Sequence, residues 1–188
     1  MHPILRRLLA AKRANSGIAA VEFAFIVPIF LVLFAGIADV SQMLYAYYEL
    51  DQAVAAGSQY AVLNAANVTS TTGAALASSI ATVVENANGS AWTNDTVVVN
   101  NGPTVTVTNG TASSSGTAAN ADKYYCITGS QGSWTWGTAY TSQSSCSPSG
   151  TAGKYVTITA SYSYVPLVGI YHVFTNSTLH QSAAVRVQ

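Results

Sequence analysis

One long stretch of the chain is almost free of charge, and it restricts what the protein can be. The 25 residues between Arg13 and Asp39 contain a single charged side chain, that of Glu22. A helix rises 1.5 Å per residue, so about 20 residues cross the hydrocarbon interior of a bilayer, which is about 30 Å thick. The segment 18–38 has this length. The sequence therefore predicts one membrane-spanning helix near the N-terminus.

The distribution of charge predicts how this helix is oriented. Four of the seven basic residues precede the apolar stretch: Arg6, Arg7, Lys12 and Arg13. Lys and Arg flanks stay on the cytoplasmic side, so we expect everything after Asp39 to be extracytoplasmic. The remainder of the chain has three basic and seven acidic residues. It lacks the basic stripe that binds phosphates, which argues against nucleic-acid binding.

Three forms of processing are compatible with this N-terminal region. A secretory signal peptide would be cut after the small residues at 36–38, whereas an uncleaved anchor would keep the whole region. Neither form gives a role to Glu22, although a charged side chain costs about 2.5–3.5 kcal/mol at the centre of a bilayer. In the third form the chain is cut after Gly17. The new amino group of Ile18 would then lie a few residues from Glu22 and supply the carboxylate with a partner.

Residues 16–23, SGIAAVEF, resemble the processing motif of type IV prepilins in its Flp/Tad form. The longer segment NSGIAAVEFAFIVPIFLVLFAGIADV is similar to the start of TadE-like minor pseudopilins of the Tad (tight adherence) pilus. The positions that match are Gly17, Ala19, Val21, Glu22, Phe23, Ala24 and Pro28. The resemblance is strong over residues 13–60, moderate over the last 35 residues and absent between them. Major Flp pilins are much shorter, which favours a minor subunit.

The resemblance implies a function in pilus assembly. A membrane-embedded prepilin peptidase would remove residues 1–17 as a cytoplasmic leader, so that Ile18 becomes the mature N-terminus. Glu22, followed by Phe23, would meet the terminal amine of a neighbouring subunit and set the register between subunits. The implied partners are the peptidase, other pilin subunits and the inner-membrane assembly platform. The implied location is the bacterial inner membrane, in a single pass, or a surface pilus.

The helical pattern continues beyond the membrane. Residues 39–66 keep a helical period, so together with the span 18–38 they predict one long spine helix. Pro28 lacks a backbone N–H, and we expect it to kink this helix. Residues 67–188 are expected to form an extracytoplasmic pilin-like domain. A second amphipathic helix is predicted over 72–87.

Alternating residues predict an antiparallel sheet in the same domain. Residues 95–100 and 104–108 read as a β-hairpin, and two further strands are expected within 154–165 and 177–188. The fold class predicted is therefore α+β: a long N-terminal helix, a second helix and an antiparallel sheet.

Residues 111–153 are rich in Ser, Thr, Gly and Ala, and we expect mostly loop there, with a short strand at 124–127. Cys126 and Cys146 have no third Cys or His at metal-ligand spacing. A disulfide would stabilise this lobe by about 3 kcal/mol, with two unpaired thiols as the alternative. The lobe also contains Trp134, Trp136 and Tyr140. These aromatic side chains would either contact a sugar or another surface, or form a small core of their own.

Signs of catalysis are missing from the sequence. The three histidines are widely scattered, so no metal site is expected. The Gly-rich segment 149–154 lacks the first Gly and the final Ser or Thr of a phosphate-binding loop. We therefore expect no catalytic residues and no cofactor, and not an enzyme. Two function classes remain: a TadE-like subunit of an adhesion pilus, or a secreted or membrane-anchored binding module for a carbohydrate or surface ligand.

Overall fold

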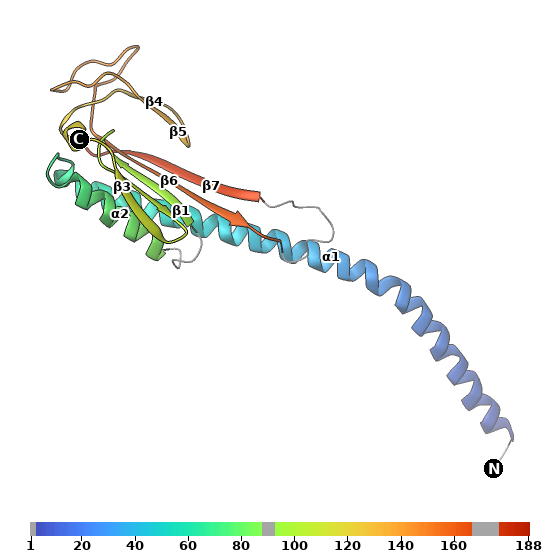
Figure 1. Ribbon diagram of the computed structural model, residues 1–188. Helices are drawn as coiled ribbons and strands as arrows, with labels where there is room; N and C mark the ends of the chain where they lie inside the picture. Colours follow the sequence, from blue (N-terminus) through green and yellow to red (C-terminus); the bar gives the residue numbers. More distant parts are fainter. Residues whose placement is uncertain (1–2, 88–92, 167–176) are drawn as a thin grey trace.

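A single long helix carries an α+β domain on its C-terminal half (Figure 1). The computed structural model describes residues 3–87, 93–166 and 177–188, with side chains described from residue 17 onward except those of Thr93 and Ser177. Helix α1 spans Pro3–Leu63 and continues through Pro28. It curves along its N-terminal half in Figure 1, whereas a local kink at Pro28 stays a prediction. A short 3-10 turn, η1 (Ala65–Asn67), leads to helix α2 (Gly73–Ala87), which returns along α1.

Five antiparallel strands form the main sheet. In the order β3-β2-β1-β6-β7 they are Thr111–Ser115, Thr104–Thr108, Thr93–Val99, Tyr155–Tyr164 and Ser177–Arg186. A second 3-10 turn, η2 (Ala118–Asp122), follows β3. Strands β4 (Ile127–Ser130) and β5 (Ser133–Trp136) pair with each other in a separate hairpin.

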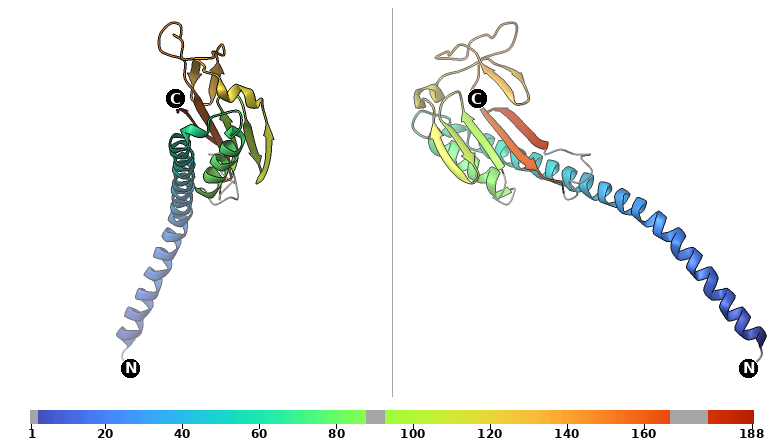
Figure 2. Two further views of the ribbon diagram at one scale, coloured as in Figure 1. Left: turned by 90° about the vertical axis from the view of Figure 1, so that its left-hand side faces the viewer. Right: turned by 45° about the vertical axis from the view of Figure 1, so that its right-hand side comes forward.

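Both helices pack against one face of the sheet, and the core lies between the helices and that face (Figure 2). Leu50 of α1, Ile80 of α2 and Ile158 of β6 are fully buried there. Gly57 allows the close approach, because an added Cβ would lie 2.7 Å from Val84 Cγ2 and 3.1 Å from Ile158 Cδ1. The C-terminal half of α1 is therefore a structural part of the domain rather than a linker to it.

Asn100 connects three segments at one end of the sheet. It has a φ of 53° in the turn between β1 and β2 and is fully buried. Its amide nitrogen donates to backbone carbonyls in and after η2, those of Ala121 at 3.1 Å and Lys123 among them. Its side-chain oxygen accepts from the backbone N–H of Tyr155 at 3.2 Å. One side chain thus satisfies backbone groups that would otherwise be buried without partners.

The predicted fold class is confirmed: a long apolar N-terminal helix, a second helix, an antiparallel sheet and a disulfide are all present. The second helix begins at Gly73, one residue after the predicted start. The two C-terminal strands lie where alternation predicted them. The apolar connection at 167–176 lies outside the described residues.

The region 111–153 contains more strand than predicted. Asn109 and Gly110 both have positive φ and turn the chain into β3, which pairs with β2. Strand β3 is exposed along its whole length, so its sequence, TASSS, has no apolar alternation to reveal it. The strand predicted at 124–127 is present only as isolated bridges of Tyr124 and Tyr125, and β4 begins at Ile127.

One buried carboxylate lies on the apolar face of the sheet. Asp95 of β1 lies on the same face as Val97 and Val99, and only 1% of its surface is exposed. Neither carboxylate oxygen has a hydrogen-bond partner in the described part of the chain. Burial, together with the nearby charge of Glu85 on α2, raises the pKa of Asp95 to about 7. Ionisation of this side chain therefore opposes folding.

Replacing Asn100 tests its bridging role. We expect Asn100→Ala to lower the free energy of unfolding by about 3 kcal/mol, because several buried backbone groups lose their partner at once. Asn109→Ala, also at a positive φ but exposed, should cost about 1 kcal/mol. Urea unfolding of the full chain in lipid nanodiscs, followed by tryptophan fluorescence, measures both. Equal effects of the two substitutions on the free energy of unfolding would contradict the bridging role of Asn100.

The stability of the domain should depend on pH through Asp95. The folded pKa lies above the usual value of 3.8, so the folded state holds the proton more tightly than the unfolded chain. The free energy of unfolding should therefore fall as pH rises from about 4 to about 7 and then level off. Asp95→Asn should remove this fall and stabilise the protein by about 2 kcal/mol at pH 8, allowing for screening by solvent. Asp51→Asn, at an exposed position of α1, is the control and should leave the pH profile unchanged.

Candidate functional site

The segment that contains the predicted processing site lies on the exposed N-terminal half of α1. Gly17 and Ile18 are exposed and helical. A Cβ added at Gly17 would meet nothing within 4 Å, so no contact among the described residues requires a glycine there. The same holds for Gly36, further along the span.

Glu22 lies one helical turn after Ile18, on the same side of α1. Residues four apart face one another along a helix, so a terminal amine on Ile18 would be within reach of this carboxylate. Glu22 is exposed. Phe23, next to it, is 67% exposed. Both side chains are free to contact a neighbouring molecule.

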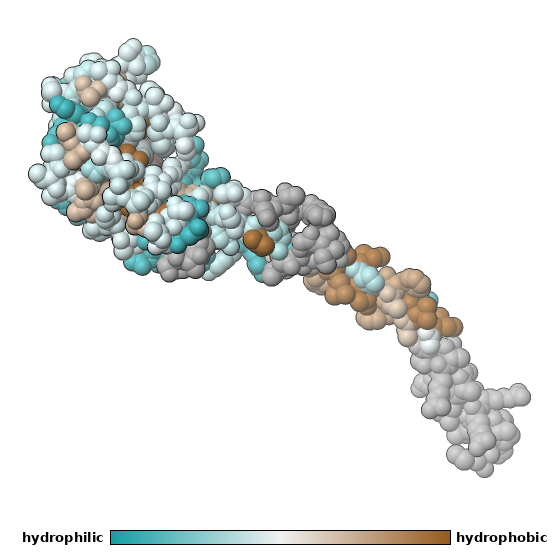
Figure 3. All heavy atoms as spheres, viewed as in Figure 1, coloured by the Kyte–Doolittle hydropathy of each residue, from teal (hydrophilic) through white to brown (hydrophobic). Residues whose placement is uncertain are grey.

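The span beyond Glu22 presents apolar side chains to its surroundings. Phe25, Phe30 and Phe34 are each more than half exposed, and the rings of Phe30 and Phe34 stack 6.3 Å apart. The apolar surface covers this part of α1 in Figure 3. A helix within Gly17–Leu63 is long and apolar enough to cross a membrane. Such a continuous exposed apolar surface needs lipid or protein around it.

The folded domain begins where the apolar span ends. Asp39 is 5% exposed, and its backbone carbonyl accepts a hydrogen bond of 2.9 Å from the hydroxyl of Tyr164, at the end of β6. One to three turns further on, Tyr45, Tyr47 and Tyr48 are exposed on α1. Tyrosines are enriched at the membrane–water boundary. The domain is thus attached to α1 directly at the end of the segment suited to a bilayer.

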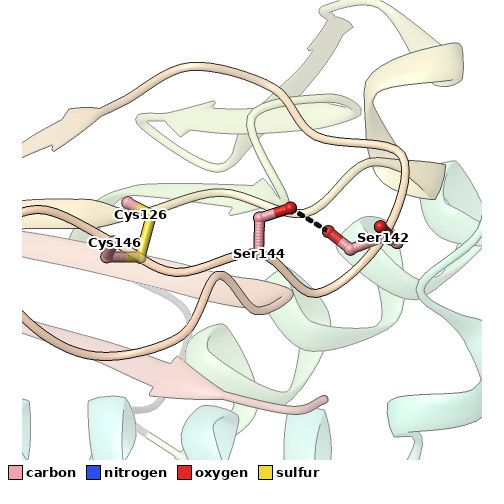
Figure 4. Close-up of a disulfide and its surroundings, with 4 residues drawn as sticks. All are labelled: Cys126, Ser142, Ser144 and Cys146. Atoms are coloured by element: carbon pink, nitrogen blue, oxygen red, sulfur yellow. Dashed lines mark hydrogen bonds between the residues drawn. A yellow bond between two sulfur atoms is a disulfide. The ribbon is translucent and has the colours of Figure 1, made fainter.

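The predicted disulfide is present in the lobe that follows η2. Cys126 and Cys146 are bonded, with their Cα atoms 5.7 Å apart (Figure 4). In the same loop the Ser144 hydroxyl donates to the backbone carbonyl of Ser142 at 3.4 Å. The disulfide joins the start of β4 to the long loop after β5.

The three lobe aromatics predicted as possible ligand contacts are placed differently from one another. Trp134 and Trp136 lie on one face of β5 and are half-buried. The ring of Trp136 meets the buried Tyr125 edge-on, with centroids 5.5 Å apart. The backbone of Tyr140 pairs with that of Tyr124. Trp136 therefore contributes to a small satellite core beneath the lobe.

Two buried charged side chains of the α+β domain were not predicted from the sequence. Asp95 shares its alternation with Val97 and Val99, so the pattern itself could have revealed a buried acid. Lys154 is also nearly buried: its ammonium donates to the carbonyl of Val68 at 2.8 Å and lies 5.7 Å from the ring centroid of Tyr124. Nothing in the sequence indicated that contact, because it joins residues far apart in the chain.

Comparison with known proteins identifies the N-terminal part of the chain. Residues 17–59 match the family model of TadE-like proteins. The whole chain matches no curated protein and no solved structure. The matched residues begin at Gly17 and include Glu22, the apolar span and most of the part of α1 that follows it. Residues 17–59 are therefore similar to TadE-like proteins, and the resemblance seen in the sequence is confirmed for this part of the chain.

Proposed function

We propose that the chain is a minor pseudopilin of a Tad-type adhesion pilus, cleaved after Gly17 and incorporated into the pilus or priming its assembly. The observation that carries this proposal is the TadE-like match over residues 17–59, which contains one carboxylate, Glu22, in an otherwise uncharged and exposed apolar span. The TadE-like family is associated with the Tad pilus. Cleavage and assembly are our inferences for this chain.

Cleavage would change how firmly the chain is held in the membrane. The leader, residues 1–17, carries Arg6, Arg7, Lys12 and Arg13. These four positive charges hold the N-terminus on the cytoplasmic side, because each would have to cross the apolar interior. After their removal, a single terminal ammonium remains. An assembly machine could then draw the span out of the bilayer at a much lower energetic cost.

The exposed Glu22 would fix the register between neighbouring subunits. A carboxylate within an apolar bundle is costly unless an opposite charge meets it, and the amine of Ile18 on a neighbouring subunit is such a charge. The gain in stability is small, because desolvation of both groups offsets most of their attraction. The value of the pair is its selectivity, since a displaced subunit would leave two charges unpaired.

The role that we propose for the remainder of the chain is also structural. No group of three or more His, Cys, Asp or Glu side chains able to hold a metal ion occurs among the described residues. We propose a non-enzymatic role with no cofactor. Its partners would be a prepilin peptidase, other pilins and the inner-membrane assembly platform, with the α+β domain on the extracytoplasmic side.

Cleavage can be tested at Gly17. In the bacterium that carries the gene, the mature protein should begin at Ile18, and Gly17→Leu should keep all of residues 1–17, because a bulky side chain would not fit the peptidase cleft. The intact mass of the purified protein measures this. Gly36→Leu is the matched control: both glycines have open space around them, so both variants should fold and insert equally.

The same measurement distinguishes the other forms of processing. A mature chain beginning at Met1 in the unaltered protein would support a plain anchor, and one beginning at Asp39 would support a secreted module. Either result would overturn the proposed cleavage. Release of the leader from Gly17→Leu at the normal rate would show that the cut does not depend on this position.

Substitution of Glu22 tests its role in assembly. Glu22→Lys should leave membrane insertion intact and abolish pili, because two positive charges would meet where a pair is expected. Glu22→Gln should reduce the number of pili per cell about tenfold or more, because the amine is left without a partner. Electron microscopy counts the pili, and immunoblots of membrane fractions check that the protein is present. Normal pili in both variants would refute the assigned role.

A further inference from the structure

A groove of about 610 Å³ lies between the tip of the β4–β5 hairpin and the main sheet. The hairpin lies over the side of the sheet that points away from α1 (Figures 1 and 2). The register of β1, β6 and β7 places six lining side chains in two cross-strand rows: Thr96, Thr159 and Ser182 in one, and Asn94, Ser161 and His180 in the other.

The chemistry of the lining restricts what the groove can bind. Its polar side chains are hydroxyls, amides and one imidazole, and none of the described residues that line it is Asp, Glu, Lys or Arg. A phosphate or a carboxylate would find no positive charge to neutralise it. A lipid chain would find hydrogen-bonding groups where it needs apolar walls. The groove is suited to a ligand that is polar and uncharged.

The internal hydrogen bonds of the floor show which groups remain available. The hydroxyl of Thr159 donates to the carbonyl of Thr96 at 3.4 Å, and that of Ser161 donates to the carbonyl of Asn94 at 3.3 Å. Both hydroxyls use their proton within the sheet and keep lone pairs as acceptors. The Asn94 side-chain oxygen accepts from the backbone N–H of Asn109 at 3.2 Å, which leaves its NH₂ group as a donor. The floor thus offers acceptors beside donors.

The tip of the β4–β5 hairpin covers the groove, and it also offers both acceptors and donors. The amide nitrogen of Gln131 donates to the side-chain oxygen of Gln181 at 2.8 Å and fastens the hairpin to the edge strand β7. This bond leaves a carbonyl oxygen on Gln131 and an NH₂ group on Gln181. Beneath the tip, the buried Ser182 hydroxyl has no hydrogen-bond partner among the described residues, and a Cβ at Gly132 would lie 3.8 Å from it.

We propose that this groove binds a short neutral oligosaccharide. Sugar hydroxyls both donate and accept hydrogen bonds, so a surface on which uncharged acceptors and donors alternate is complementary to them. The volume of the groove lies within the range of small-ligand sites, about 300–1,000 Å³. The site is distinct from Trp136, which packs on Tyr125. It goes beyond the proposed pilus function and does not depend on cleavage of the leader.

Binding can be tested with the full chain in phosphatidylcholine nanodiscs, which avoids detergents that carry sugar headgroups. A glycan array would first be screened, and isothermal titration would then use chitotriose, maltotriose and the best neutral oligosaccharide on the array. We expect at least one neutral oligosaccharide to bind, and a sialylated oligosaccharide of equal length to bind at least tenfold more weakly.

Variants of the floor assign the binding to this groove. Asn94→Ala and His180→Ala should each weaken the affinity about three- to tenfold, as expected for the loss of one hydrogen bond. Thr159→Trp should abolish binding by filling the groove. Thr178→Ala is the matched control, because Thr178 is exposed on the same face of β7 as His180 but lies outside the groove. Thermal unfolding followed by circular dichroism checks that each variant is folded.

Three results would overturn the proposal. One is the absence of binding to any neutral glycan at millimolar concentration. Another is tighter binding of the sialylated oligosaccharide. The third is neutral-glycan binding that Asn94→Ala and His180→Ala leave unchanged. These two substitutions alter exposed side chains, so the test remains decisive even if Thr159→Trp fails to fold.

Discussion

The structure depends on one helix whose two halves lie in different environments. The half of α1 before Asp39 exposes its apolar side chains, whereas the half after Asp39 buries Leu50 and Ala53 against a sheet. Lipid or neighbouring subunits can cover the first half, and the folded domain covers the second. Because the helix is continuous, the position of the domain is fixed relative to the apolar span. No separate linker joins the span to the domain in the described part of α1.

The junction between the two halves is a specific set of contacts. The Tyr164 hydroxyl bonds the backbone carbonyl of Asp39 and so holds the end of β6 at the last turn of the span. Gly57 then lets α2 and β6 approach α1 more closely than any other residue would allow. A pull on the N-terminal half of α1 would therefore be transmitted to the sheet through side-chain packing. Such a coupling would suit the proposed extraction of the chain from a membrane as one piece.

The sequence predicted the parts of the fold that depend on local periodicity. The apolar span, the second helix and the strands of alternating residues were all visible, because side chains must repeat every 3.6 or 2 residues to bury one face. Strand β3 was missed, because a fully exposed edge strand has no apolar repeat. The contacts of Asn100 and Lys154 were also out of reach, since each joins segments that only the tertiary fold brings together. In the lobe, the cysteine pair was predicted correctly. The roles of Gly17 and Glu22 stay predictions, and the groove above β6 could not be predicted, because it depends on the register of three strands.

The two candidate sites lie in different parts of the chain, and their chemistry explains why they can be separate. The proposed cleavage and assembly would require the segment 17–59 to fit a peptidase and neighbouring helices, and for this it offers an apolar surface, a small residue and one carboxylate. The groove is built from Ser, Thr, Asn, Gln and His on the exposed face of a sheet, where side chains can change without disturbing the core on the other face. The family match ends at residue 59, before any groove residue. The proposed assembly and the proposed sugar binding can therefore be tested independently, one through α1 and the other through the face of the sheet that points away from α1.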